Sequence, residues 1–371
     1  MNVLFVMSDA LLYGSSKSML DLAIFLSNNN VCVKFLLPSH GPLAEELKKS
    51  KVEYKIYKYA GWVNPIGCKM DKIKFPLKWL YNQVRLFHIG KWIKENDFQI
   101  IHSANSTVYF GALIARKFNI KHVWHLREFL EEDYGIEFSG KRYARRLLRE
   151  ADELICISKV VYEKFYSMVN CQMNLVYNGV KKGHYDSDRF KANKISIVMI
   201  GSLIETKGQG QAIEAAKLLV DKGYEIELNI IGDGPDEVKL KQRVEVAHLT
   251  GTVLFHGFSN DVCNFRKKAD IALVCSHQEA FGRVTAEAMM AGNLVIGANS
   301  GGTAELVTDE KTGLLYTPGR YKDLAEKIEW AINHPKLSRT IIENARKEAV
   351  SKFEYERYAK DVLHIYRKLI G

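Results

Sequence analysis

The sequence predicts an α/β protein with two Rossmann-like domains, each built on a parallel sheet. Short apolar or β-branched runs alternate with segments of helical length along the whole chain. The length of 371 residues exceeds that of one usual domain. A polar, charged stretch at 181–194 separates two sets of strand-like runs. We therefore expect ligands at the carboxyl ends of the strands and in the cleft between the domains.

Apolar runs of strand length mark the elements of both sheets. In the first half they are NVLFVMS, VCVKFLLP, EYKIYKY, FQIIHSA, KHVWHL, ELICIS and NLVYNGV. In the second half they are ISIVMIGS, IELNIIGD, VLFHGF, IALVC and LVIGAN. Segments of helical length, such as 209–222 and 235–247, lie between them. We therefore expect parallel strands with helices on both faces of each sheet.

The domain boundary is expected within the polar stretch. This gives a first domain over 1–185 and a second over 186–355. The remaining residues, 356–371, continue an amphipathic helical pattern with no strand after it. We expect this helix to pack back on the first domain. A helix that simply completes the second domain fits the same pattern.

The composition favours an ordinary globular protein of a reducing compartment. Apolar residues make up 47% and charged residues 26% of the chain. The six cysteines form no C-x-x-C pair, which disfavours a zinc site or a disulfide framework. The start, MNVLFVMSDA, has the pattern of a strand rather than of a signal peptide. No apolar run approaches the roughly 18 residues that a membrane span needs. We expect a cytoplasmic protein.

Positive charge is concentrated in the first half of the chain. The formal net charge is +10. Residues 51–150 hold 19 basic and 10 acidic residues, whereas 191–371 hold 25 and 24. Such an asymmetry is expected where one domain meets an anionic membrane surface or a phosphorylated acceptor. The alternative is a basic face that is merely solvated. No nucleic-acid recognition module accompanies the charge, so we expect no nucleic acid as a partner.

The stretch EAFGRVTAEAMMAG (279–292) carries the most specific chemistry. It follows the strand-like run IALVCSHQ and has the apolar spacing of a helix that ends at Gly292. Glu279 then lies in the strand-to-helix loop, beside N–H groups that can bind a diphosphate. Gly282 lets the backbone approach a ligand. Glu287, inside the helix, can accept hydrogen bonds from a ribose, and Glu279 can accept them from a sugar. The structural alternative is that Glu279 caps the helix and Glu287 lies on the surface.

With its internal F-G, this E-x7-E stretch resembles the signature of the retaining glycosyltransferases of family 4, which have the GT-B fold. Other segments resemble motifs of the same family and follow in the expected order. They are YNGV (177–180), IGSLIETKGQ (200–209), IIGDGP (230–235), HGF (256–258), SGGTAELV (300–307) and TGLLY (312–316). The resemblance covers the whole second domain and, more weakly, the first.

The resemblance implies a role for each matching residue. The first domain would bind the acceptor and the second the nucleotide sugar. Glu287 would bind the ribose, Glu279 the hydroxyls of the donor sugar, and Lys207 would neutralise the diphosphate in place of a metal. The implied catalytic residues are His125, Lys207 and Glu279. The implied donor-binding residues are Gly14, Ser202, Lys207, His256, Glu279, Ala280, Phe281, Gly282, Arg283 and Glu287.

Two of these positions need a separate argument. His125 stands among apolar residues, where a histidine is more often a satisfied core residue. Its place at a strand end, followed by Arg127, favours contact with the transferred sugar, which is the role that the resemblance implies. Ser202 departs from the family, which often has an arginine there, so one phosphate partner is missing. We expect Arg127 or Arg283 to supply it, with Arg127 as a phosphate or acceptor contact.

Two other motifs do not support a second kind of site. DSD (186–188) matches the metal–nucleotide triplet of the other large glycosyltransferase fold, but it lies in the linker. GDGP (232–235) is part of a dinucleotide fingerprint that position 237, a glutamate, leaves incomplete. No P-loop and no H-E-x-x-H motif occurs. We expect no metal and no other cofactor.

The only indication of the acceptor is a pattern of basic residues beside aromatic ones. Residues 75–94 and 141–150 place lysines and arginines beside aromatic residues, which suits contact with anionic lipid headgroups. The alternative is that the aromatic residues pack in the core and the basic residues are solvated. A lipid-diphosphate-linked glycan at the inner face of the cytoplasmic membrane is the acceptor that fits this pattern.

The function predicted is a retaining glycosyltransferase of cell-surface polysaccharide synthesis. It would move a hexose or N-acetylhexosamine from a nucleotide sugar, a UDP-sugar rather than GDP-mannose, to a glycan or lipid-linked glycan. Two alternatives stay open. A nucleotide-sugar 2-epimerase of the same architecture would convert the donor without an acceptor, and a non-catalytic protein would bind the nucleotide sugar without turnover.

Overall fold

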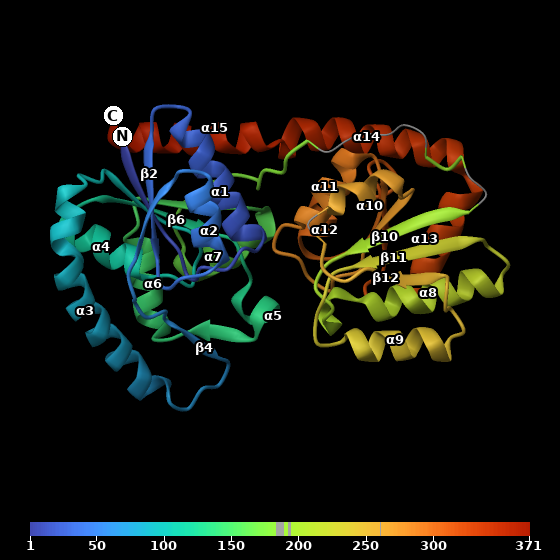
Figure 1. Ribbon diagram of the computed structural model, residues 1–371, viewed down its shortest axis with the longest axis horizontal. Coiled ribbons are helices and arrows are strands. Elements are labelled where there is room, and N and C mark those ends of the chain that lie inside the picture. The colour runs from blue at the N-terminus through green and yellow to red at the C-terminus, as the bar shows by residue number, and fades with distance from the viewer. Residues whose placement is uncertain (183–188, 192–193, 260) are drawn as a thin grey trace. The chain divides into compact units, whose positions relative to one another are not determined.

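The computed structural model describes two compact units (Figure 1). The described residues are 1–182, 189–191, 194–259 and 261–371, with Lys72 described by its backbone alone. Residues 1–179 and 356–371 form the first unit, and residues 180–355 form the second. The boundary expected at 185/186 and the DSD triplet lie outside the described residues.

The first unit is built on a seven-stranded sheet whose neighbouring strands are all parallel. The strands are β1 (Asn2–Val6), β2 (Cys32–Leu37), β3 (Glu53–Ile56), β5 (Ile100–Ser103), β6 (Lys121–Leu126), β8 (Glu153–Cys156) and β9 (Asn174–Leu175). Their order is β3–β2–β1–β5–β6–β8–β9. The order of connection reverses between β1 and β5, which makes the carboxyl ends of these strands a switch point for ligand binding.

Helices connect these strands. They are α1 (Gly14–Ser27), α2 (Pro42–Lys49), α3 (Asp71–Glu95), α4 (Phe110–Phe118), α5 (Leu130–Tyr134), α6 (Lys141–Arg149) and α7 (Lys159–Val169). A short antiparallel pair, β4 (Val63–Pro65) with β7 (Ile136–Phe138), was not expected from the sequence. The C-terminal helix α15 (Tyr355–Ile370) belongs almost entirely to this unit, because residues 356–371 cluster with residues 1–179.

The second unit has a six-stranded sheet, also parallel throughout. Its order is β12–β11–β10–β13–β14–β15. The strands are β10 (Ile195–Ile200), β11 (Ile226–Ile231), β12 (Val253–Phe255), β13 (Ile271–Val274), β14 (Leu294–Ala298) and β15 (Leu314–Tyr316). The switch point lies between β10 and β13. The last strand, β15, was missed in the sequence because its three residues follow a turn-like T-G pair.

Helices cover both faces of the second sheet. Figure 1 shows α8 (Gln209–Asp221) and α9 (Glu237–Val246) on one side, with α10 (Val262–Lys268), α11 (Arg283–Ala291) and α12 (Gly301–Leu306) on the other. Helices α13 (Tyr321–Asn333) and α14 (Pro335–Phe353) complete the unit, together with the 3₁₀ turn η1 (Glu205–Lys207). The predicted α/β class with parallel sheets in two Rossmann-like halves is thus confirmed.

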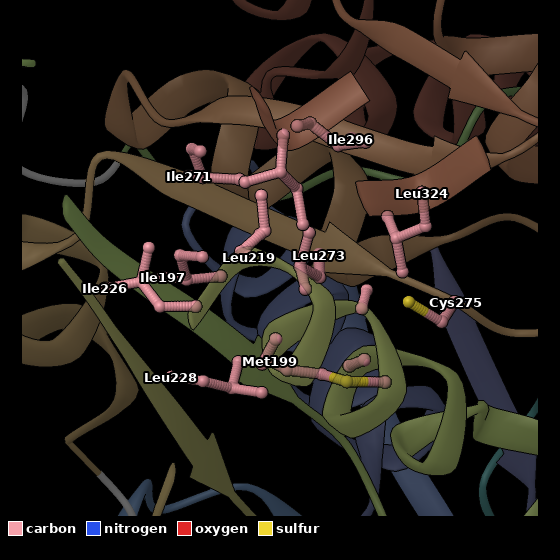
Figure 2. Packing of buried hydrophobic residues seen from close by; sticks show 14 of the residues in the cluster. Ile197, Met199, Leu219, Ile226, Leu228, Ile271, Leu273, Cys275, Ile296 and Leu324 are labelled. Carbon is pink, nitrogen blue, oxygen red and sulfur yellow. The ribbon is translucent and has the colours of Figure 1, made fainter. Parts of the chain in front are cut away.

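Alternate residues of the second sheet build one continuous core. Ile197 and Met199 of β10, Leu228 of β11 and Leu273 of β13 point to the same face and meet Leu219 of α8 (Figure 2). The opposite face is also covered, so these strands are apolar on both sides. The rigid sheet fixes the loops after β10 and β13, which carry the polar residues considered next.

Candidate functional site

Two charged side chains from the switch-point loops of the second unit form an ion pair. Lys207, in the loop after β10, places Nζ 2.6 Å from Oε1 of Glu279, in the loop after β13. The Ser276 hydroxyl donates to the same oxygen at 2.6 Å. Both charged side chains are partly exposed, at 31% and 20%. A cation and a hydrogen-bond acceptor therefore stand together where a ligand can reach them.

Glycines hold the two loops against each other. Gly208 has a φ of +77°, and a Cβ there would lie 2.4 Å from the carbonyl oxygen of Cys275. Gly302 donates its N–H to the Glu279 carbonyl at 2.7 Å, and a Cβ on Gly302 would lie 2.4 Å from the Phe281 carbonyl oxygen. The backbone on both sides of Glu279 is thus fixed by contacts that only glycine allows.

The start of helix α11 offers donors for an anion. The helix begins after Gly282, whose φ of +85° turns the chain, and no side chain of the described residues caps it. The hydroxyls of Thr285 and Thr303 are buried beside this turn and have no partner among the described residues. Main-chain N–H groups, the positive end of the helix dipole and two hydroxyls suit a phosphate group.

The residues between Glu279 and Arg283 contribute mainly through their backbone. Ala280 and Phe281 are buried. The Phe281 ring packs edge-on against Phe353, with centroids 5.8 Å apart. The phenyl ring therefore belongs to the core of the unit, and only the main chain of this loop can face a ligand.

Glu287 is held by two arginines. Its carboxylate lies 2.6 Å from Nη2 of Arg266 and 3.2 Å from Nη2 of Arg283. The Arg266 side chain is only 5% exposed, whereas that of Glu287 is 24% exposed. The arginines fix the position of the carboxylate, and each oxygen can still accept a hydrogen bond from a neighbouring hydroxyl.

The two other predicted residues of this unit lie at exposed turns. His256, at the end of β12, places Nε2 2.7 Å from Oδ1 of Asn229, and its ring lies 4.7 Å from that of Phe265. Ser202 follows β10, and its carbonyl accepts from Nε2 of Gln209 at 2.9 Å. A base or a phosphate could reach either residue.

The predicted residues of the first unit differ in exposure. Gly14 is the exposed first residue of α1. The Ser16 hydroxyl accepts the Tyr13 N–H at 2.9 Å and thus fixes the turn before this helix. His125, near the end of β6, is fully buried, and Arg127 is nearly so.

Arg127 lies in a polar cluster with the C-terminal helix. Its Nη1 donates to Asn178 at 3.0 Å, and its Nη2 donates to the hydroxyl of Tyr358 at 2.7 Å. Nη2 also lies 3.2 Å from Nδ1 of His125, which in turn lies 3.2 Å from Nε2 of His102. Burial, with the Arg127 charge nearby, holds the pKa of His125 well below its usual value, so the ring is neutral.

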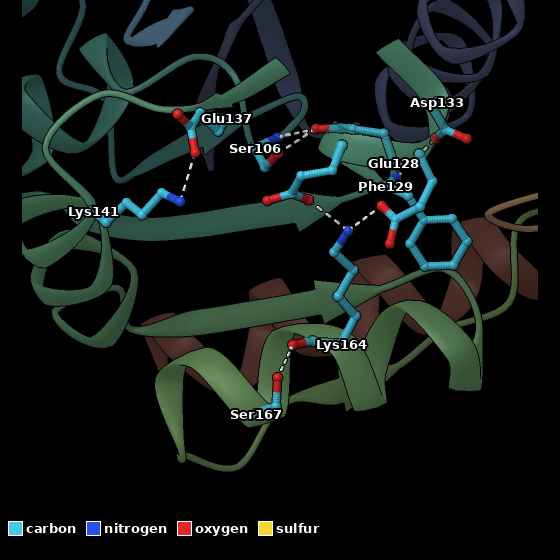
Figure 3. A network of polar contacts seen from close by, with 10 residues as sticks. Ser106, Glu128, Phe129, Asp133, Glu137, Lys141, Lys164 and Ser167 are labelled. Atoms are coloured by element: carbon cyan, nitrogen blue, oxygen red, sulfur yellow. Dashed lines mark hydrogen bonds and ion pairs between the residues drawn. The ribbon is translucent and has the colours of Figure 1, made fainter. Parts of the chain in front are cut away.

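The neighbouring Glu128 is a buried carboxyl group. Its Oε1 accepts from the N–H of Ser106 at 2.7 Å and also from the Ser106 hydroxyl (Figure 3). Burial raises the pKa of Glu128 to about 7, although the Ser106 hydrogen bonds and the Arg127 charge act in the opposite direction. By comparison, Lys164, which is labelled in Figure 3, forms a more exposed ion pair with Glu131.

The chain was also compared with known protein families. Residues 13–182 match the family profile described as Glycosyltransferase Family 4, and residues 184–348 match that of Glycosyl transferases group 1. The chain belongs to glycosyltransferase family 4. The resemblance seen in the sequence is confirmed.

Individual relatives agree with this assignment. An uncharacterised glycosyltransferase of Methanocaldococcus jannaschii is 29% identical over 77% of this chain and 80% of its own length. A capsular polysaccharide biosynthesis glycosyltransferase of Staphylococcus aureus is 29% identical over 46% of this chain, which is 45% of that protein. The crystal structure of Anabaena HepE with UDP has a TM-score of 0.83 at 22% identity and covers 99% of this chain and 100% of that one. The fold is GT-B.

Several features of this candidate site were not apparent from the sequence. Ser276, three residues before Glu279, could have been found as a polar residue of the same loop. No sequence pattern marks Arg266 or His102 as functional, because their partners lie on other helices or strands. Among the described residues, no cluster of three or more His, Cys, Asp or Glu side chains could hold a metal ion. No helix in the described part of the chain has the length and apolar content needed to cross a membrane.

Proposed function

We propose that this glycosyltransferase moves a hexose or N-acetylhexosamine from a UDP-sugar, in preference to GDP-mannose, to a glycan acceptor with retention of the anomeric configuration. The observation that carries the proposal is the pair of Lys207 and Glu279 beside the start of α11. The relative HepE, whose structure was solved with UDP-glucose at 21% identity and a TM-score of 0.81, supports the choice of nucleotide.

The donor roles follow from the chemistry of these residues. The diphosphate would lie at the start of α11, with Lys207 as its cation and no metal. Glu287 would accept hydrogen bonds from the ribose, and Glu279 from the sugar. Arg283 would add positive charge near the phosphates in place of the arginine that Ser202 replaces. His256, Gly14 and Ser202 would contact the remaining parts of the donor.

The transfer step needs no side-chain nucleophile. The bond between the anomeric carbon and the phosphate oxygen breaks, and its electron pair leaves with UDP. The acceptor oxygen bonds to the same face of the anomeric carbon, and its proton passes to the departing phosphate oxygen. Lys207 and the helix start stabilise the charge that develops on the leaving group.

Titration calorimetry with UDP and GDP, on the wild type and on Glu287→Ala, tests the donor assignment. We expect UDP to bind and GDP not to bind, with weaker UDP binding in the variant. Binding of GDP alone would overturn the preference. Proton NMR of the product anomer then tests retention. Donor conversion without acceptor would indicate the 2-epimerase, and nucleotide binding without any turnover would indicate the non-catalytic alternative.

The acceptor is proposed to be a lipid-diphosphate-linked glycan on the cytoplasmic face of an anionic membrane. Helix α3 supports this partner. Ile73, Leu77, Leu80, Val84 and Phe87 recur every three or four residues along it, and each is 50% exposed or more. They form one apolar stripe facing solvent, which a bilayer interface would cover.

Charge around this stripe favours lipid over a second copy of the chain. Between Asp71 and Glu95, α3 has several basic residues and no acidic one. Trp79 donates to the hydroxyl of Tyr143 at 3.2 Å, so α6 lies alongside. The exposed arginines of α6, of which Arg142, Arg145 and Arg149 make no ion pair with the described residues, add to the positive charge. Two such faces would repel each other, whereas anionic headgroups would attract them.

Vesicle flotation tests this surface. We expect the wild type to float with vesicles containing phosphatidylglycerol and not with pure phosphatidylcholine. The double variant Leu80→Glu with Phe87→Glu should lose most of this binding. The matched control is Val238→Glu with Val246→Glu, whose side chains on α9 are 68% and 81% exposed. No flotation of the wild type, or a dimer that the α3 variant dissociates, would overturn the membrane proposal.

A further inference from the structure

A chain of buried polar groups ends at the side chain of His125. Tyr366, on α15, hydrogen-bonds through its hydroxyl to Nδ1 of His102. Nε2 of His102 lies 3.2 Å from Nδ1 of His125. His102, His125 and Tyr366 are fully buried. Nε2 of His125 is itself buried and has no partner among the described residues.

Two proton arrangements satisfy the first two links. In one, each hydrogen points towards His125, so Tyr366 donates to His102, which donates to His125. In the other, every hydrogen points the opposite way. The first arrangement leaves an N–H at Nε2 of His125, and the second leaves a lone pair there. Distances between heavy atoms in the Tyr366–His102–His125 chain do not distinguish them.

The position of Arg127 distinguishes the two proton arrangements. Its Nη2 lies 3.2 Å from Nδ1 of His125. A guanidinium only donates and does not lose its proton in proteins. One hydrogen of Nη2 goes to the Tyr358 hydroxyl, which leaves one for Nδ1 of His125 and for Sδ of Met19 at 3.3 Å. A hydrogen on Nδ1 of His125 would face this N–H donor, so Nδ1 presents its lone pair and the neutral ring carries its hydrogen on Nε2. His102 must donate to the same lone pair, so its Nδ1 accepts from Tyr366.

The geometry points to a tautomer lock: Arg127 and His102 hold His125 with its hydrogen on Nε2, as a donor aimed at an oxygen of the ligand. Tyr366, on the C-terminal helix, donates to His102 at the other end of this chain of hydrogen bonds. Within the proposed function, on which this step rests, that oxygen belongs to the transferred sugar. A buried N–H without an acceptor is costly, so a ligand oxygen would stabilise the complex. Arg127, His102 and Tyr366 are thus positioning residues.

Nitrogen NMR of protein labelled at histidine tests the lock without any substrate. Long-range proton–nitrogen correlations distinguish a protonated ring nitrogen from one with a lone pair. His125→Asn and His102→Gln identify the two signals by their loss. We expect Nε2–H with a bare Nδ1 on both rings of the wild type. A hydrogen on Nδ1 of His125, or a charged ring near pH 7, would overturn the inference.

Binding and turnover test the consequence for the ligand. His102→Leu removes the donor and should lower kcat/KM for the UDP-sugar about tenfold, the effect of one hydrogen bond, while the affinity for UDP stays unchanged. His102→Gln keeps an N–H and should restore most of the activity. Tyr109→Phe removes a buried hydroxyl outside the lock and is the control.

The outcomes separate the two proposals. Equal losses in the Leu and Gln variants, or a parallel loss of UDP affinity, would reduce His102 to a packing residue and overturn its positioning role. If the wild type binds no UDP-sugar, the proposed donor fails, yet the NMR result still decides the tautomer.

Discussion

Lys207 and Glu279 form a 2.6 Å ion pair between two loops at the carboxyl end of one sheet. Each residue would find a new partner in a bound nucleotide sugar, because the lysine suits a phosphate and the carboxylate suits hydroxyl groups. The pair keeps both side chains in place before the donor arrives. Its partial exposure keeps the energy of separation small. Binding can therefore exchange these partners at low cost.

Replacing Lys207 by methionine tests its role at the leaving group. We expect kcat to fall on the order of 10²-fold to 10³-fold, since such electrostatic stabilisation acts mainly in the transition state. The donor KM should change much less. Initial-rate kinetics with a UDP-sugar measure both values. Lys241→Met, which breaks a similar surface pair with Glu237 at 2.7 Å, is the matched control and should keep full activity. Equal kcat in the two variants would contradict the role.

Glu287→Gln tests the ribose contact. The amide keeps the shape of the side chain but loses the charge that strengthens hydrogen bonds. We expect UDP affinity to fall roughly tenfold to a hundredfold, as for the loss of charge-assisted bonds. Uridine should lose affinity in the same proportion, because it also contains the ribose. Calorimetry with both ligands measures this. Unchanged affinity for uridine would show that Glu287 does not contact the ribose. Glu348→Gln, a surface partner of Lys352, is the control.

The sequence predicted the parts of this site that lie in one loop, and missed those that depend on packing between distant elements. Glu279, Gly282 and Glu287 could be placed from the strand and helix that flank them. Arg266, which holds Glu287, lies on α10 and reaches it only because α10 packs against α11. No local pattern marks such a pair.

The contact of His102 with Tyr366 joins residues 264 positions apart. The sequence predicted that the C-terminal helix packs on the first domain, but no pattern marks which residue of the helix meets which strand, so this contact could not be predicted. The fold could be predicted more readily than the site, because helices cover both faces of the sheets and most of the strands are rich in apolar residues. The exceptions were β4, β7 and β15, which have three residues each and stand beside glycine or proline residues that are typical of turns.

Gly208→Ala tests the contact between the two loops. Gly208 has a φ of +77°, and a Cβ would meet the Cys275 backbone at 2.4 Å. Gly223 has a similar φ of +85° with nothing within 4 Å. Both alanine variants should lose about 1 kcal/mol from the backbone conformation. Only Gly208→Ala should lose more, and only it should weaken UDP binding. Urea unfolding and calorimetry of the pair check this, and equal losses would argue against the contact.

The raised pKa of Glu128 predicts how the stability of the fold depends on pH. Burial raises its pKa from 4.5 to about 7 in the folded protein. The unfolded chain therefore releases this proton at lower pH than the folded chain does. The contribution of the protonated Glu128 carboxyl group to the free energy of unfolding is fully present below about pH 4.5 and is lost as the pH rises through about 7.

The variant Glu128→Gln has the same shape and no proton to release at this position. Between about pH 5 and about pH 7.5 the wild type should lose about 2 kcal/mol of unfolding free energy relative to Glu128→Gln. Above about pH 8 the difference should stay constant, because the carboxyl group is then ionised in both the folded and the unfolded wild type. Urea unfolding of both proteins across this range measures the difference. A difference independent of pH would mean that the buried carboxyl group ionises at its ordinary value.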